Sequence, residues 1–234
     1  MKKLFLLLGV ALLATTPMSA QEQRSQKEIN KEVQALLKMS DKQLNEKASK
    51  DARKEAKRLA KEGWVVGAGE LPLEKMLDRS YQLQYQYGED LLPKYILGDG
   101  KSIGENYNAA KAGAEAAARL SVAGAVESNI TALINTKLAN GELGQEEAVS
   151  LAQTVAGSKN LIQENLPKNL SLVRCYRVFP NKNQEARIIV FFDVNTANKA
   201  AAKALKEKIK EDKRAELDSK ADELIKSVDK LLGF

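Results

Sequence analysis

The sequence predicts a helix-dominated α+β protein with a small, mainly antiparallel sheet. Three observations support this class: Lys/Glu/Ala-rich ends with helical apolar periodicity, a single β-hairpin pattern over residues 170–194, and an alanine-rich stretch after Glu105 that predicts a helix covering the sheet. The expected segments are residues 1–20, a helical segment 21–62, an α+β core domain 63–195, and a long C-terminal helix 196–234.

The first segment has the pattern of a secretory signal peptide. Lys2 and Lys3 make its start positive, residues 4–14 are almost entirely apolar, and small residues then lead to a predicted cleavage after Ala20. The apolar run of about 11 residues is shorter than the ~20 residues that a membrane span needs. Gln21, not cysteine, would become the new N-terminus. We therefore expect an exported protein, periplasmic or extracellular, that is not lipid-anchored through an N-terminal cysteine.

Composition excludes several kinds of site from residues 21–234, the mature chain that the predicted cleavage would leave. Loss of Lys2 and Lys3 lowers the formal net charge from +6 to +4, and the excess is spread over Lys/Glu-rich helical turns, which does not indicate a nucleic-acid partner. No later run of residues is apolar enough to cross a bilayer. The chain has no histidine, which excludes His-based triads and His metal ligands. Cys175 is the only cysteine, so the chain has no internal disulfide.

Two helices are expected in residues 21–62. Ser40 and Gln43 have capping-box spacing and predict the start of the second helix, which has a thin, alanine-rich apolar side. Gly63 predicts its end. The apolar stripe of the first helix consists of Ile29, Val33, Leu36 and Leu37.

A short strand-like run over residues 64–67 precedes another predicted helix. Pro72 suits the first turn of this helix and Gly88 its end. Tyr81, Tyr85 and Tyr87 form an aromatic cluster, which we interpret as a helix face packed in the core; a sugar-stacking surface is the alternative.

The sequence from Tyr95 predicts a strand, a glycine turn and a long helix. The strand is expected at residues 95–97, the turn at 98–104, and the alanine-rich helix from Glu105 to about Leu138. A Walker A phosphate loop would need a glycine five residues before Gly100, where Tyr95 stands, so nucleotide binding is not predicted. A further helix over 145–164 is expected to stop before Pro167.

The hairpin strands are expected at residues 170–179 and 186–194, joined by a turn at 180–184. Cys175 lies in the middle of the first strand and has no histidine to activate it, so a packed thiol is expected.

The C-terminal helix carries a heptad-like row of apolar residues. This row covers only about two heptads, so intramolecular packing is favoured over dimerisation. A homo-oligomer would use Leu217, Leu224, Val228 and Leu231. The full row, called here the C-terminal seam, is Leu217, Ala221, Leu224, Val228 and Leu231.

The order of elements over residues 95–194 resembles a known domain. The pieces YILGDGKSIGENYNAAKAGAEAAARLSVAGAV and SLVRCYRVFPNKNQEARIIVFFDV resemble the LPP-twenty-type domain of small outer-membrane lipoproteins and the similar N-terminal domain of the flagellar assembly protein T. The resemblance implies an envelope protein whose helix-covered sheet serves association. The lipidation cysteine of those lipoproteins is missing, residues 21–62 and 64–88 lie outside the resemblance, and no functional residue is carried over.

Together these observations favour a non-enzymatic envelope or secreted protein that binds a protein or an envelope polymer. We assign no catalytic residue, cofactor or metal ligand. Such a role predicts an exposed apolar or aromatic patch on the sheet or on the C-terminal seam. Two alternatives stay open. A small-ligand carrier would need a cavity beside Ala114, Ala118 or Val122. A carbohydrate-active enzyme would use paired carboxylates, for which the candidates are Glu70, Glu74, Asp78, Glu89 and Asp90.

Overall fold

The structure is a computed structural model that describes residues 46–88, 91–168, 171–213 and 220–233. The chain divides into two compact units, Met1–Lys47 and Ala48–Phe234, and every helix and strand described below belongs to the second. In this part of the chain seven helices accompany one three-stranded sheet, which confirms the helix-dominated α+β class. The stripe predicted over residues 29–37 lies outside the described residues.

The sheet has the strand order β1-β3-β2, and both pairs of strands are antiparallel. Its strands are β1 (Tyr95–Gly104), β2 (Val173–Val178) and β3 (Gln184–Asp193). β2 and β3 form the predicted hairpin, which shows that the local β pattern was sufficient there. The strand-like run at residues 64–67 pairs only through Val65, which exchanges hydrogen bonds of 2.8 and 2.9 Å with Tyr176 at the edge of β2.

β1 is longer than predicted because the glycines expected to form a turn are part of the strand. Pairing with β3 continues through Gly98 and Gly100 as far as Gly104, and the following helix begins only at Tyr107. The predicted glycine turn is therefore wrong. The sequence alone could not show that these glycines belong to a strand, because glycine weakens the interior of a strand. It is found there where another backbone approaches closely.

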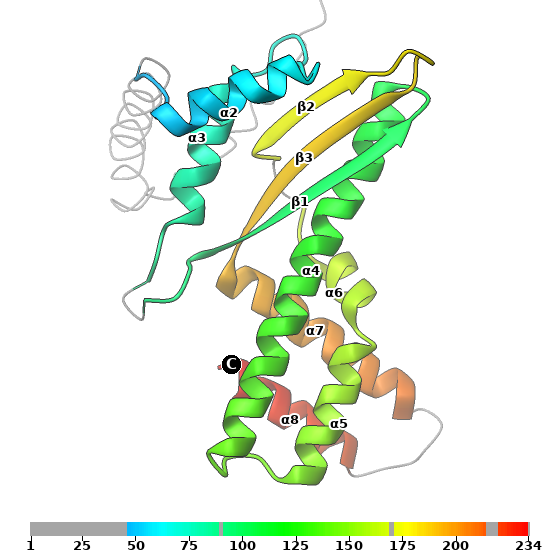
Figure 1. Cartoon of the computed structure of the whole chain (residues 1–234). Coiled ribbons are helices and arrows are strands. Elements are labelled where there is room, and N and C mark those ends of the chain that lie inside the picture. Colours follow the sequence, from blue (N-terminus) through cyan, green and yellow to red (C-terminus); the bar gives the residue numbers. More distant parts are fainter. Residues whose placement is uncertain (1–45, 89–90, 169–170, 214–219, 234) are drawn as a thin grey trace, which may run out of the picture. The chain divides into compact units, whose positions relative to one another are not determined.

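α4 (Tyr107–Ala139) supplies that close approach. Figure 1 shows α4 passing behind the sheet and continuing beyond it. A Cβ atom at Gly98 would lie 2.0 Å from the Ala118 carbonyl oxygen, and one at Gly100 would lie 2.2 Å from the Ala114 carbonyl oxygen. Glycine on the strand and alanine on the helix thus let the two backbones pack with almost no side chain between them. The prediction of a helix packed closely on the sheet is confirmed.

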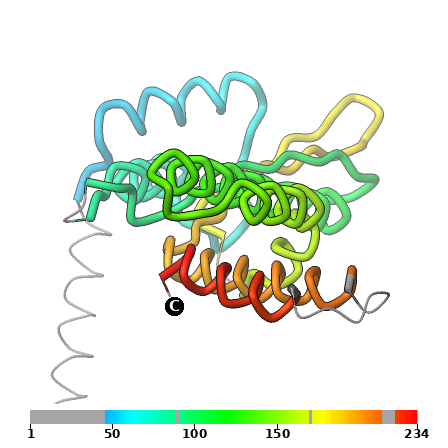
Figure 2. Tube along the Cα trace, turned by 90° about the horizontal axis from the view of Figure 1, so that it is seen from below, coloured from blue at the N-terminus to red at the C-terminus, as the bar shows by residue number. Residues whose placement is uncertain are grey.

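The part of α4 beyond the sheet packs with four further helices. Figure 2 shows α8 (Lys220–Leu232) alongside α7 (Val194–Lys213). The single helix predicted over 145–164 is two helices, because the backbone at Gly157 ends the first and the buried Ser158 hydroxyl donates to the Thr154 carbonyl oxygen over 2.5 Å. The single helix predicted over 196–232 is also two helices. The four are α5 (Gln145–Ala156), α6 (Lys159–Asn165), α7 (Val194–Lys213) and α8 (Lys220–Leu232).

The described part of the C-terminal seam packs within the chain. Val228 is fully buried and Leu231 is 5 % exposed, and both belong to the core that α4 and α7 share. Ala221 and Leu224 are partly buried against the same core, whereas Leu217 lies outside the described residues. This arrangement is the intramolecular alternative that the heptad pattern left open.

The opposite face of the sheet carries α2 (Lys50–Lys61) and α3 (Leu73–Gln84). α2 begins at Lys50, because the Ser49 side chain accepts a hydrogen bond from the Ala52 amide. Residues 46–49 are not helical, so the helix predicted to continue from Ser40 to residue 62 is wrong over this stretch; Ser40 itself lies outside the described residues.

The predicted end of α2 at Gly63 is confirmed. Gly63 has φ +85°, its amide donates to the Ala60 oxygen, and the Trp64 amide donates to the Leu59 oxygen over 3.0 Å. These two bonds form a Schellman motif, which needs a residue with positive φ directly after the helix.

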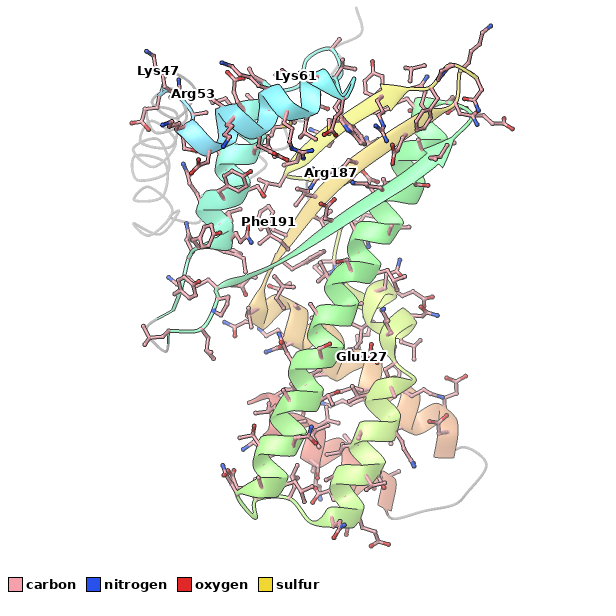
Figure 3. All side chains as sticks on the ribbon, in the orientation of Figure 1. Lys47, Arg53, Lys61, Glu127, Arg187 and Phe191 are labelled. Atoms are coloured by element: carbon pink, nitrogen blue, oxygen red, sulfur yellow. The ribbon has the colours of Figure 1, made fainter. Side chains whose placement is uncertain are left out.

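Large side chains build the core between α2, α3 and this face of the sheet. Its apolar members include Trp64, Met76, Leu77, Cys175 and Ile189. Arg187 and Phe191, labelled in Figure 3, belong to the same face of β3 as Ile189, because side chains two residues apart on a strand share a face.

Candidate binding surface

Backbone hydrogen bonds join the described parts of the loop between α3 and β1. The Gly88 amide donates to the Leu92 oxygen over 2.8 Å, and the Lys94 amide donates to the Gln86 oxygen over 2.9 Å. Tyr87 and Pro93 form an isolated antiparallel bridge between the two sides of the loop. We call residues Tyr85–Lys94 the 85–94 loop; residues 89–90 within it are not described.

This loop concentrates exposed apolar side chains. It holds four of the ten large hydrophobic side chains that the described residues expose. Leu91 is 81 % exposed, and its backbone has φ +62°, a left-handed conformation that leucine rarely adopts. The four are Tyr85, Tyr87, Leu91 and Leu92. The patch lies neither on the sheet nor on the C-terminal seam, the two places where the sequence predicted it.

The tyrosine cluster is divided between the core and the surface. Tyr81 is partly buried against the α2/α3 core, and this burial raises the pKa of its phenol. The prediction of a core face was wrong for Tyr85 and Tyr87, which are 67 % and 52 % exposed. The reason is that α3 ends at Gln84, four residues before the predicted end at Gly88, so the helical period does not apply to these two tyrosines.

The candidate carboxylates take part in local contacts. Glu70 binds Arg174 of β2 over 2.7 Å. Asp78 accepts hydrogen bonds from the Ser49 amide over 3.0 Å and from the Gln82 amide nitrogen over 3.2 Å. Glu74 is exposed in the first turn of α3, where a carboxylate complements the helix dipole, and Glu89 and Asp90 lie outside the described residues. Glu70 and Asp78 therefore have structural contacts of their own in the described part of the chain.

Cys175 is packed as the sequence predicted. It lies in the core between β2 and the α2/α3 helices, and its Sγ atom is 4.0 Å from the Arg187 carbonyl oxygen. Burial raises the pKa of the thiol from about 9.0 to about 11. Because the thiolate is the nucleophilic form, this environment suppresses thiol chemistry at neutral pH.

The space where a carrier cavity would lie is filled. Ala114, Ala118 and Val122 have no solvent exposure, and the backbone of β1 lies directly against them. Among the described residues, no group of three His, Cys, Asp or Glu side chains gathers as a metal site.

Sequence reasoning missed Leu91 and Leu92 entirely. The signal available was an apolar pair between Gly88 and Pro93, because glycine and proline mark loops and loops run over the protein surface. The exposed positive side of α2 was likewise taken as an ordinary solvated helix face.

In the described part of the chain, no helix combines the length and apolar character that a membrane span requires. A scan against protein-family models finds no match, and searches of the curated proteins and of the solved structures also find none. The resemblance to the LPP-twenty-type domain therefore stays a prediction.

Proposed function

We propose that this chain is a non-enzymatic, exported protein of the cell envelope that binds a partner protein through the 85–94 loop. The observation that carries the proposal is the exposure and positive φ of Leu91. A leucine that is 81 % exposed gains little from burial in its own chain, and a left-handed backbone costs a residue with a Cβ atom about 1 kcal/mol. A side chain that is both exposed and strained suggests a role outside the folding of its own chain.

The composition of the loop favours a protein partner. Tyrosine and leucine bind by filling apolar pockets, and tyrosine is enriched among residues that dominate binding energy at protein interfaces. Tyr85, Tyr87 and Leu91 stand on a loop held by backbone hydrogen bonds, so little conformational entropy would be lost on binding. The signal peptide predicted from the sequence supports binding outside the cytoplasm.

Site-specific photo-crosslinking in cells tests the proposal. A photoreactive residue at Tyr87 should form one discrete protein adduct, whereas the same residue at Val149 of α5 should not. Val149 is a matched control because both side chains are 52 % exposed. Equal labelling at both positions, or an adduct only with glycan, would contradict a protein-binding loop.

A substitution at Leu91 separates binding from folding. Leu91→Gly should weaken the Tyr87 adduct, while the free energy of unfolding stays unchanged or rises by up to ~1 kcal/mol, because glycine adopts positive φ without strain. Urea denaturation measures the stability. A variant that loses stability and keeps its adduct would show that Leu91 serves the fold instead.

A further inference from the structure

The exposed side of α2 carries a row of positive charge. Its members recur at i, i+3, i+4, i+7 and i+11, so they lie on one side of the helix, opposite the buried Ala52, Ala56 and Leu59. All are exposed, and over eleven residues of helix the row extends for about 16 Å. We call this row the basic face; it consists of Lys50, Arg53, Lys54, Lys57 and Lys61. Arg53 and Lys61 are labelled in Figure 3.

The acids of α2 do not neutralise this face. Glu55 and Glu62 both bind Arg58, which lies on the flank of the helix, and Glu55 does so over 2.6 Å. Asp51 lies in the first turn, where a carboxylate complements the helix dipole. Within the described residues, none of the five side chains of the basic face takes part in an ion pair. The face therefore presents five positive charges to solvent.

An apolar groove opens beside the basic face. It has a volume of about 390 Å³ and lies between α2, the chain after it and the start of α3. Its walls are mostly apolar, including Ala60, Trp64, Val65 and Leu73, with Lys57 and Glu74 as its charged members. Val65 is 48 % exposed, and it lines the same groove as Lys57 of the basic face.

We propose that the basic face of α2 and this groove dock the protein on a surface of anionic phospholipid. The five cations would meet headgroup phosphates, and Val65 with the groove would contact the apolar layer beneath them. A soluble polyanion would use the charges but not the groove. Because the basic face and the groove lie side by side, they favour a ligand that carries phosphate and hydrocarbon together, as a phospholipid does. The inference goes beyond the proposed function and uses none of the residues of the 85–94 loop.

The size of the effect follows from the number of charges. Each lysine near an anionic bilayer strengthens binding about fivefold, so removing three should weaken it by about 100-fold. Binding should also fall as salt concentration rises, because these charges are exposed and are screened.

Vesicle co-sedimentation of the mature chain, purified from the envelope fraction after loss of its leader, tests the proposal. The probe is phosphatidylcholine vesicles with and without phosphatidylglycerol. We expect binding only with phosphatidylglycerol, and a loss of at least about 100-fold in K50E/K54E/K61E, because each substitution removes a positive charge and also adds a negative one; Lys57 of the groove stays in place. The matched control K199E/K203E/K210E changes the net charge equally on α7, at three exposed lysines, and should keep most of the binding. Circular dichroism verifies that each variant is folded.

The groove decides between a lipid and a soluble anion. V65N, which removes the apolar side chain without adding a charge, should lower vesicle binding by about tenfold through loss of apolar contact, while binding of soluble polyphosphate stays unchanged. V149N, at a similarly exposed valine of α5, is the control. Vesicle binding unchanged in V65N would mean that the face recognises phosphate charge alone. That result, equal losses in the α2 and α7 triple variants, or equal binding to neutral vesicles would each overturn the proposal. None of these outcomes depends on the Tyr87 adduct.

Discussion

The two faces of the sheet are packed in opposite ways. On the α4 face, β1 contributes Gly98 and Gly100, and the helix contributes Ala114 and Ala118, so backbone lies against backbone. On the α2/α3 face, the core is built from large side chains such as Trp64. The first face depends on the absence of side chains and the second on their volume.

The two faces also differ in the contacts that their charged side chains make. On the α2/α3 side, the Arg187 Nε atom donates to Asp99 over 3.0 Å, and the Arg177 guanidinium lies 5.0 Å from the Trp64 ring and 5.1 Å from the Phe179 ring. Through these long side chains, Arg187 links β3 to β1, and Arg177 links the hairpin to Trp64 in the chain after α2. The α4 face has no space for such contacts at its glycine positions. Added volume should therefore damage the first face, and lost volume the second.

The largest effect is expected from Gly100→Val. A Cβ atom at this position would lie 2.2 Å from both the Ala114 oxygen and the Ala118 nitrogen, and neither backbone atom can move independently. We expect a loss of more than about 4 kcal/mol in the free energy of unfolding, or failure to fold. Circular dichroism and urea denaturation measure it.

The neighbouring residue on the same strand provides the control. Lys101 is exposed on the other face of β1, and Lys101→Val should change the stability by no more than about 0.5 kcal/mol. A milder Gly100→Ala variant should still be clearly destabilised. If Gly100→Ala were as stable as the parent, α4 would not be in backbone contact with β1.

A smaller loss is expected from Trp64→Ala on the α2/α3 face. Trp64 is 4 % exposed, and its removal leaves a cavity between α2 and β2 and takes the ring from beneath Arg177. We expect a loss of about 3 kcal/mol, measured by urea denaturation followed by circular dichroism. Trp64→Phe, which keeps most of the volume, should recover more than half of that loss. Equal losses in the two variants would contradict packing by side-chain volume.

The hairpin and the alanine-rich helix could be predicted because their signals are local. A run of Ile, Val and Phe residues in β3, and apolar residues at helical spacing in α4, each indicate one structure without reference to the rest of the chain. The glycines of β1 could not be predicted as strand. Glycine is needed at these positions because the backbone of α4 packs against them. α4 follows β1 in the sequence, and this contact exists only in the folded chain.

The candidate surface was predicted less well than the fold. The helical spacing of apolar residues continues in the sequence through Tyr85, whereas α3 ends at Gln84. The spacing alone therefore assigned the exposed tyrosines to the core. Leu91 gave no periodic signal. It lies exposed and with positive φ in a loop joined by backbone hydrogen bonds, and no spacing of apolar residues reveals such a loop.

The smallest effect concerns the pH dependence of the α2/α3 face, which buries the thiol of Cys175. In the unfolded chain this thiol ionises near pH 9, whereas burial raises its pKa to about 11 in the folded chain. Between these values the unfolded state binds fewer protons, so stability falls as the pH rises. The contribution of Cys175 is fully present below pH 9 and should decrease by about 2 kcal/mol by pH 11.

Cys175→Ala isolates this contribution from the lysines and tyrosines that titrate in the same range. Urea denaturation at pH 8 and at pH 11 gives the difference, and the parent should lose about 2 kcal/mol more than the variant. Loss of the side chain itself lowers the stability at both pH values and cancels in the comparison. Parallel losses in the two proteins would mean that the thiol ionises normally. The α2/α3 face would then admit water at β2, and its packing would be looser than that of the α4 face.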